Sequence, residues 1–182
     1  MPQRKLRGKA AKAAYFVPTG NGNYTYIGPQ YSLSLDAGIT AKKAGARRII
    51  ISICIVALSV VCGLLPVPGM SNTFYVIIPY ALTMIFGVVL LWKSSRITYW
   101  GSDSLREYVY NTTVTQLPVY ATLCAVFACV SVAGEGLCLI LEKANRNVLF
   151  AVIFILSHIV IFALSILLRR LEKPLEWVKS NE

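Results

Sequence analysis

Two ionisable residues, Glu135 and His158, lie inside long apolar stretches of this sequence. Within a bilayer an ionisable side chain costs about 2.5–3.5 kcal/mol on insertion scales, and such residues commonly mark ion or proton pathways. A carboxylate and an imidazole can pass a proton between them, so the chemistry open to this pair is proton or cation transfer. Ser131, four residues before Glu135, and Ser157, next to His158, supply the nearest hydroxyl groups.

Helix geometry decides whether these side chains can meet. If the chain folds back about residues 142–147, residue 135 lies level with about residue 154, and His158 lies roughly 6 Å away in depth, about one helical turn. Three interpretations remain open. The pair could form an interhelical hydrogen bond, typically worth about 1 kcal/mol or less; it could dock a partner's polar side chain; or it could relay ions. We favour the structural role.

Four apolar runs must position these residues, at about 49–65, 74–92, 119–141 and 148–168. A bilayer core about 30 Å thick needs roughly 20 apolar residues in a helix. The sequence therefore predicts an all-α membrane protein whose four transmembrane helices form two antiparallel hairpins, within a transmembrane domain at 49–168. At 56% hydrophobic and 14% charged residues, the composition excludes an ordinary soluble enzyme, a disordered acidic tail and a disulfide-stabilised miniprotein.

The positive charge is distributed unevenly along the chain. Of the 18 Lys and Arg residues, nine lie in the first 48 positions, none lies in 66–73, three lie in loop 93–118, two lie in 142–147 beside Glu142, and four lie in the tail 169–182. Because short loops rich in Lys and Arg stay in the cytoplasm, we expect the loop and both termini to be cytoplasmic. A bacterial cytoplasmic membrane is the expected location, since the compact chain shows no cleaved leader.

The segment 1–14 is a basic tail. Its cationic residues, with two more at the predicted membrane edge, are Arg4, Lys5, Arg7, Lys9, Lys12, Arg47 and Arg48. Basic residues near an anionic surface each gain about 1 kcal/mol, so the tail is expected to bind anionic lipid or to act only as a solvated orientation signal. Nucleic-acid binding is the less favoured alternative.

The cytoplasmic segments are rich in tyrosine and β-prone. Alternating residues at 24–27 and 31–35, separated by glycine turns, predict a small hairpin or three short strands within segment 15–48. In loop 93–118, residues 96–100 are predicted as a strand, and Ser104 with Glu107 is predicted as a capping box that opens a short helix. These two segments could pair in one composite sheet.

Recognition of a partner is the predicted function of this face. An isolated hairpin is marginally stable, and exposed Tyr and Trp are favoured at interfaces. The partner-facing candidates are Tyr24, Tyr26, Tyr31, Tyr99, Trp100, Tyr108 and Tyr110. We expect a non-catalytic membrane subunit or scaffold whose partner is another protein or a second copy. The alternative is a small transporter or channel component that uses Glu135 and His158.

No catalytic residue, cofactor or metal ion is predicted. The five cysteines all lie in apolar runs without a CxxC pair, so a zinc site is not expected. The glycine-rich turn at 20–23 lacks the lysine and spacing of a phosphate-binding loop. The loop carboxylates Asp103 and Glu107 have no neighbouring catalytic group in the sequence, which argues against an enzyme.

Overall fold

The computed structural model describes residues 15–19, 23–34, 41–70, 73–100, 104–141, 147–173 and 175–180. Four long helices dominate it: α2 (Ala41–Leu64), α3 (Phe74–Trp100), α5 (Leu117–Leu141) and α6 (Val148–Glu172). Each is long and apolar enough to cross a membrane. The prediction of a mostly helical protein with four membrane-spanning helices is confirmed at that level, by length and composition.

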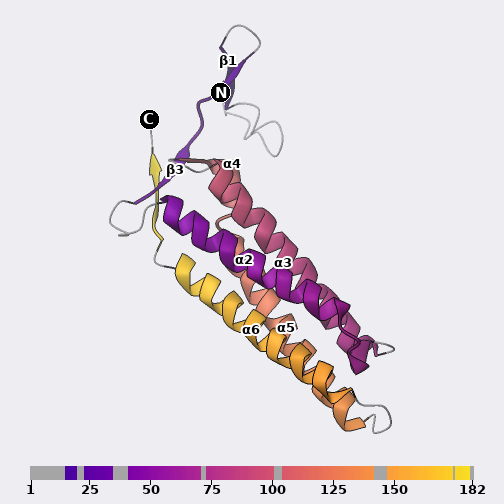
Figure 1. Ribbon diagram of the computed structural model, residues 1–182. Coiled ribbons are helices and arrows are strands. Elements are labelled where there is room, and N and C mark those ends of the chain that lie inside the picture. The colour runs from indigo at the N-terminus through magenta and orange to yellow at the C-terminus, as the bar shows by residue number, and fades with distance from the viewer. Residues whose placement is uncertain are drawn as a thin grey trace, which may run out of the picture.

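The helices pack as one elongated bundle (Figure 1). Helix α5 contacts both α6 and α3, and α2 contacts both α3 and α6. A single 3-10 turn, η2 (Pro68–Met70), follows α2 and packs on α3, α5 and α6. Two buried clusters form the interior, one around Ile55, Leu90 and Leu117 and one around Tyr80 and Phe154.

The helices are longer than the apolar runs that predict them. Helix α2 begins eight residues before position 49, and α3 continues eight residues past position 92. The predicted strand at 96–100 is therefore wrong, because these residues are the last turns of α3. Ile97 is only 2% exposed there. Extending a helix that has already formed costs much less than nucleating one, so its end is set by packing and not by local β-propensity.

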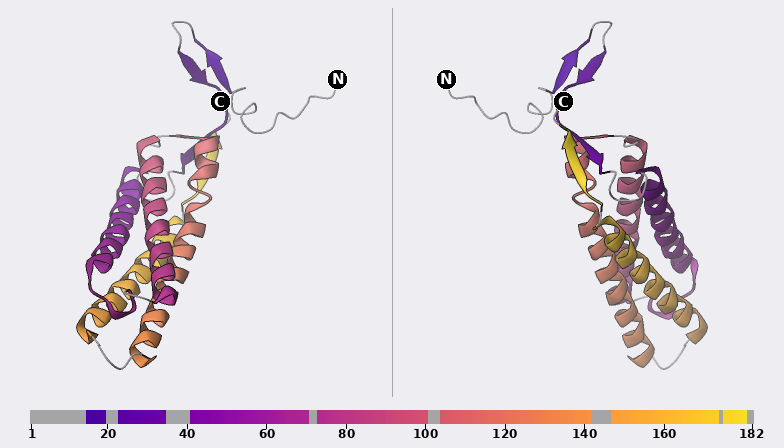
Figure 2. Two further views of the ribbon diagram at one scale, coloured as in Figure 1. Left: turned by 90° about the vertical axis from the view of Figure 1, so that its right-hand side faces the viewer. Right: turned by 90° about the vertical axis from the view of Figure 1, so that its left-hand side faces the viewer.

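Five short strands gather at one end of the bundle (Figures 1 and 2). They are β1 (Phe16–Pro18), β2 (Tyr24–Tyr26), β3 (Gln30–Leu33), β4 (Leu105–Arg106) and β5 (Trp177–Ser180). Strands β1 and β2 form an antiparallel hairpin, and the order of the second sheet is β4-β3-β5. This sheet joins the N-terminal segment to the central loop, and its third strand comes from the C-terminal tail, which the sequence analysis did not assign to a sheet.

Aromatic side chains attach the three-stranded sheet to the helices. Tyr31 of β3 stacks on Tyr110 with ring centroids 4.1 Å apart and an interplanar angle of 4°. Trp177 of β5 meets Tyr110 edge-on at 6.1 Å. These three rings pack against a cluster that includes Leu105 and Val109, both fully buried. The sheet therefore closes one end of the helical bundle.

The capping box predicted at Ser104 and Glu107 is not formed. Helix α4 (Glu107–Thr112) begins two residues later than this capping box predicts, and its N-cap residue is Arg106, which makes no side-chain capping hydrogen bond. The Ser104 hydroxyl instead donates to Gln30 Oε1 at 2.5 Å. Because β4 immediately precedes the helix and pairs with β3, Ser104 is used to join two strand ends.

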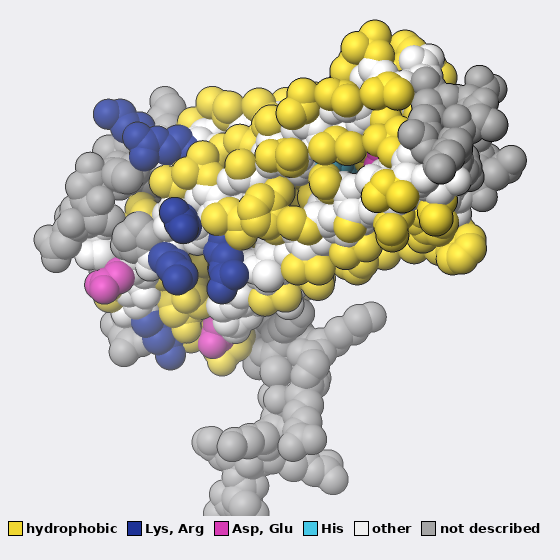
Figure 3. Space-filling view, turned by 90° about the horizontal axis from the view of Figure 1, so that it is seen from below, with side chains coloured by type: hydrophobic (Ala, Val, Ile, Leu, Met, Phe, Trp, Pro, Cys, Tyr) yellow, Lys and Arg dark blue, Asp and Glu magenta, His cyan; other side chains and the backbone are white. Residues whose placement is uncertain are grey.

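An apolar surface surrounds the bundle. Large hydrophobic side chains are exposed on all four long helices, for example Ile50, Ile85, Val126 and Leu156. Figure 3 shows this surface extending along the helices, with Lys and Arg gathered toward one end. Exposed side chains of this kind suit contact with lipid, since a soluble monomer rarely exposes so large an apolar area.

Candidate functional site

His158 is completely buried within the helical bundle. Its Nδ1 atom lies 3.0 Å from the Phe154 carbonyl oxygen one turn earlier in α6. Its ring lies 4.0 Å from the Phe154 ring and 6.1 Å from that of Tyr80, measured between centroids. The Nε2 atom has no hydrogen-bond partner in the described part of the chain. The imidazole is thus held by one backbone contact inside an aromatic pocket.

Glu135 is also completely buried, in helix α5. Its carboxylate packs against Gly69 in the 3-10 turn, so closely that a Cβ atom at Gly69 would collide with Oε2. The same Cβ would lie 2.8 Å from a methyl group of Val76. A larger residue at position 69 would therefore require the side chains of Glu135 and Val76 to shift.

The two polar residues lie beside different elements. Glu135 lies beside Gly69 of the 3-10 turn, whereas His158 lies beside Tyr80 of α3. That Glu135 and His158 lie one helical turn apart stays a prediction. Ser131, the third candidate, is buried and donates to the Phe127 carbonyl oxygen at 2.9 Å, so its hydroxyl is used within its own helix.

Glycines around Glu135 differ sharply in their surroundings. A Cβ at Gly134 would lie 2.7 Å from the Tyr75 carbonyl oxygen, whereas a Cβ at Gly136 would meet nothing within 4 Å. The close approach of α5 to α3 therefore depends on Gly134 and not on Gly136.

We expect Gly134→Ala to lower the free energy of unfolding by about 1–3 kcal/mol, since backbone must move to admit the methyl group. The matched change Gly136→Ala should be neutral or stabilise by up to about 1 kcal/mol, because alanine favours the helix. Reversible unfolding in detergent micelles measures both. Equal destabilisation by the two changes would contradict the close α3–α5 contact.

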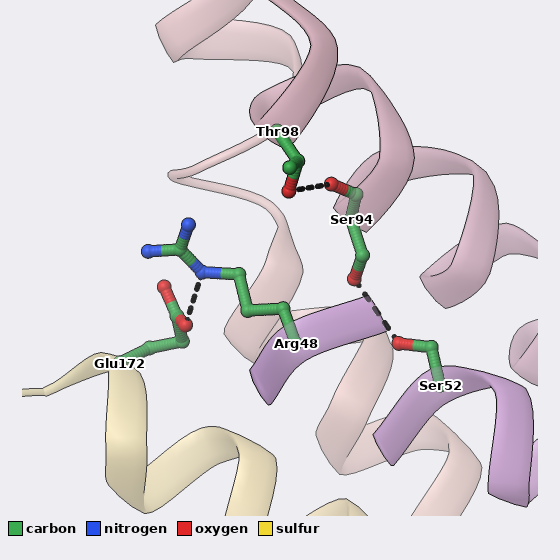
Figure 4. A network of polar contacts seen from close by, with 5 residues as sticks. All are labelled: Arg48, Ser52, Ser94, Thr98 and Glu172. Atoms are coloured by element: carbon green, nitrogen blue, oxygen red, sulfur yellow. Dashed lines mark hydrogen bonds and ion pairs between the residues drawn. The ribbon is translucent and has the colours of Figure 1, made fainter. Parts of the chain in front are cut away.

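A second polar cluster lies at the end of the bundle that carries the sheet (Figure 4). Arg48 of α2 donates from Nε to Glu172 Oε1 of α6 at 2.5 Å, and their side chains are 4% and 7% exposed. Nearby, the Ser52 and Ser94 hydroxyls are 3.1 Å apart and join α2 to α3. Because both contacts are buried, they fix which faces of these helices meet.

Lys93 is a further buried cation at this end, only 4% exposed. Its ammonium group donates to the Thr112 carbonyl oxygen at 2.5 Å and to Gln116 Oε1 at 2.9 Å. The same nitrogen lies 4.8 Å from the centroid of the Tyr120 ring. Lys93 therefore joins the end of α3 to the turn between α4 and α5. Lys93 was expected only as one of the charges of loop 93–118, whereas it lies within α3.

The tyrosine candidates separate into packed and exposed groups. Tyr31, Tyr108 and Tyr110 are half-buried and pack against the main apolar cluster, while the Tyr26 hydroxyl donates to the Pro29 carbonyl oxygen at 3.2 Å. Tyr24 is 68% exposed. The side chains of Tyr99 and Trp100 lie outside the described residues.

The basic candidates are likewise separated. Arg47 is exposed, whereas Arg48 is buried in its ion pair with Glu172. The other five, Arg4, Lys5, Arg7, Lys9 and Lys12, lie outside the described residues. Burial of Arg48 could have been suspected from one signal, the acidic residue Glu172 that lies close to the end of the last span.

In the ranges that the structure describes, no group of three His, Cys, Asp or Glu side chains is placed to hold a metal ion. Comparisons with protein-family models, with curated proteins and with solved structures find no match for this chain. Inferences about function must therefore start from its own residues.

Proposed function

We propose that this chain is a non-catalytic integral membrane subunit or scaffold that recognises a protein partner through its sheet-bearing end. Its four helices would cross the membrane as two antiparallel hairpins, with both termini in the cytoplasm and the short connections outside. The charges support this orientation: Lys43, Arg47, Arg169 and Arg170 lie at the sheet-bearing end, whereas the connections proposed to lie outside contain no Lys or Arg at 66–73 and two at 142–147. A bacterial cytoplasmic membrane remains the proposed location.

The hairpin of β1 and β2 carries this proposal. It extends beyond the helical bundle (Figure 2) and exposes apolar side chains on a small structure. Tyr24 is 68%, Ile27 60% and Val17 43% exposed. A two-stranded hairpin alone is marginally stable in water, so covering these side chains with a partner would both stabilise the hairpin and remove apolar surface from water.

The base of the hairpin is held by aromatic and cationic contacts. The Tyr26 ring meets the Phe16 ring at 5.3 Å between centroids. The Arg106 guanidinium carbon lies 5.3 Å and 5.7 Å from the Tyr26 and Phe16 rings. Cation–π contacts of this kind are worth about 0.5–1 kcal/mol at exposed sites. The base is thus fixed to β4, while Tyr24 and Ile27 remain available to a partner.

Changing both exposed residues, Tyr24→Ser with Ile27→Ser, should dissociate the chain from its assembly. We expect the wild-type protein, extracted in mild detergent, to elute as a stable complex of defined stoichiometry. The amount of partner that co-elutes with the double variant should be at least tenfold lower. This loss corresponds to removing one or two interface anchors, each costing about 1–2 kcal/mol or more. Size-exclusion chromatography with light scattering gives the stoichiometry.

Val178→Ser is the matched control, because Val178 is 53% exposed at the same end of the molecule but lies on β5, outside the hairpin. It should leave the complex intact. Elution of the wild-type chain as a monomer would contradict the proposal. If the monomer also catalysed ion flux in proteoliposomes that was lost in His158→Ala and Glu135→Gln, the transporter alternative, supported by full burial of both residues, would replace it.

A further inference from the structure

A small hollow opens between the first turns of α2 and the last turns of α6. Helix α2 contributes Arg47 and Arg48 to its lining. The end of α6 and the residues that follow contribute Leu168, Leu171, Glu172 and Leu175. Its lining surface is mostly apolar, and its charged part comes from Arg47, Arg48 and Glu172. Such a lining suits a ligand that is anionic at one end and apolar at the other.

Arg48 is not fully satisfied by the protein around it. Its Nε donates to Glu172 at 2.5 Å, but its Nη2 is buried and has no hydrogen-bond partner within the described ranges. Figure 4 shows the two terminal nitrogens of Arg48 extending past Glu172, away from Ser52 and Ser94. A buried guanidinium donor without an acceptor is unfavourable, so an anionic oxygen supplied from outside would complete its hydrogen bonding.

The charge around the hollow favours an anion. Glu172 neutralises one of the two lining arginines and leaves the other in excess. Further cations lie on the same two helix ends and are exposed: Lys43, Arg169, Arg170 and Lys173. Figure 3 shows Lys and Arg side chains gathered at one end of the apolar surface. An anion in the hollow would therefore be held in a positive field.

The apolar half of the hollow continues into the lipid-facing surface. Leu168 is completely buried beneath it, and the neighbouring Leu167 is 44% exposed on the outside of α6. On α2 the next exposed residue inward is Ile50, at 60%. An acyl chain leaving the hollow would thus lie against apolar side chains on both helices, at the level where a bilayer passes from headgroups to hydrocarbon.

We propose that this hollow binds one anionic phospholipid. The phosphate group accepts hydrogen bonds from Arg47 and from the terminal nitrogens of Arg48, and an acyl chain lies along Leu171 and the exposed Leu167. Arginine is suited to this role because its planar fork matches phosphate oxygens. The inference goes beyond the proposed function, because it holds whether or not the hairpin binds a partner.

The test is a native mass spectrometry titration of the full, delipidated chain with phosphatidylglycerol and, separately, with phosphatidylcholine. We expect one phosphatidylglycerol to bind with at least tenfold preference over phosphatidylcholine. Arg47→Gln should weaken it about tenfold, since one direct charge-assisted contact is lost. Arg170→Gln removes the same charge from an exposed position outside the hollow and should change binding less than twofold.

Ala44→Leu tests the site without changing any charge, because Ala44 lines the hollow and a larger side chain would fill it. It should abolish the preferred binding while leaving the helical circular dichroism unchanged. Equal weakening by Arg47→Gln and Arg170→Gln would overturn the proposal in favour of diffuse attraction. Displacement of the lipid by millimolar inorganic phosphate alone would also overturn it, since the site would then recognise a free anion.

Discussion

Replacing Arg48 with alanine is expected to lower the free energy of unfolding by about 3–5 kcal/mol, because removal of one partner from a buried ion pair leaves the other charge uncompensated. Here the remaining charge is Glu172, whose side chain is 7% exposed at the end of α6. Among the described residues, the Arg48 guanidinium is the hydrogen-bond and ion-pair partner of that carboxylate. Steric trapping or reversible denaturation in detergent measures the loss.

The double change Arg48→Met with Glu172→Met separates charge from packing. Replacing both members of a buried pair by apolar residues of similar size is often neutral or stabilising, so the double variant should recover most of the stability lost by Arg48→Ala. Arg47→Ala is the matched control; Arg47 is the exposed neighbour, and surface changes of this kind stay within about 0.5 kcal/mol. Equal effects at positions 47 and 48 would show that the ion pair is not formed.

The four helices could be predicted because each contains a long run of apolar residues, and the length of such a run is itself a physical requirement of the bilayer. The ends could not. Segments 43–48 and 169–172 each contain three charged residues, and hydropathy alone places them outside a span, yet they continue α2 and α6. A helix that leaves the bilayer keeps its backbone hydrogen bonds in water, so polarity marks the membrane edge and not the helix end.

The β-propensity of residues 96–100 led to a wrong strand prediction for a related reason. Ile97, Thr98 and Tyr99 favour strands when considered alone, but they follow a helix that is already formed, and Ile97 packs into the interior at 2% exposure. The Thr98 hydroxyl also donates to the Ser94 carbonyl oxygen at 3.0 Å within the same helix. Tertiary contacts, which no short window of sequence contains, decided the outcome.

In the candidate site, too, some residues could be predicted from the sequence and others could not. Glu135 and His158 could be found from the sequence because they interrupt apolar runs, and each is buried in the structure. The pairing of Arg48 with Glu172 joins residues 124 positions apart. Finding it requires knowing that the start of α2 lies beside the end of α6, and charge alone had placed Arg48 at the membrane surface. Contacts between residues far apart in the sequence depend on how the helices are arranged in the fold. A polar residue within an apolar run, by contrast, can be recognised in a short stretch of sequence.

Trp177→Ala is expected to destabilise the sheet-bearing end by about 3 kcal/mol, toward the lower end for a large aromatic side chain because Trp177 is only half-buried. Its indole packs against Tyr110 and the main apolar cluster. Strand β5 pairs Trp177 with Leu33, and the Ser34 amide donates to the Glu176 carbonyl oxygen at 2.9 Å. Loss of the indole should therefore release β5 and expose one edge of β3.

Hydrogen exchange distinguishes this local opening from global unfolding. In Trp177→Ala the amides of β3 should exchange at least tenfold faster, while those in the middle of α5 stay protected, since the sheet packs at one end of the bundle. Val178→Ala is the matched control: Val178 is the next residue of the same strand but is 53% exposed. Its truncation should leave β3 unchanged. Equal acceleration by both changes would show that β5 is held by its backbone pairing with β3, and that the indole contributes little to closing this end of the bundle.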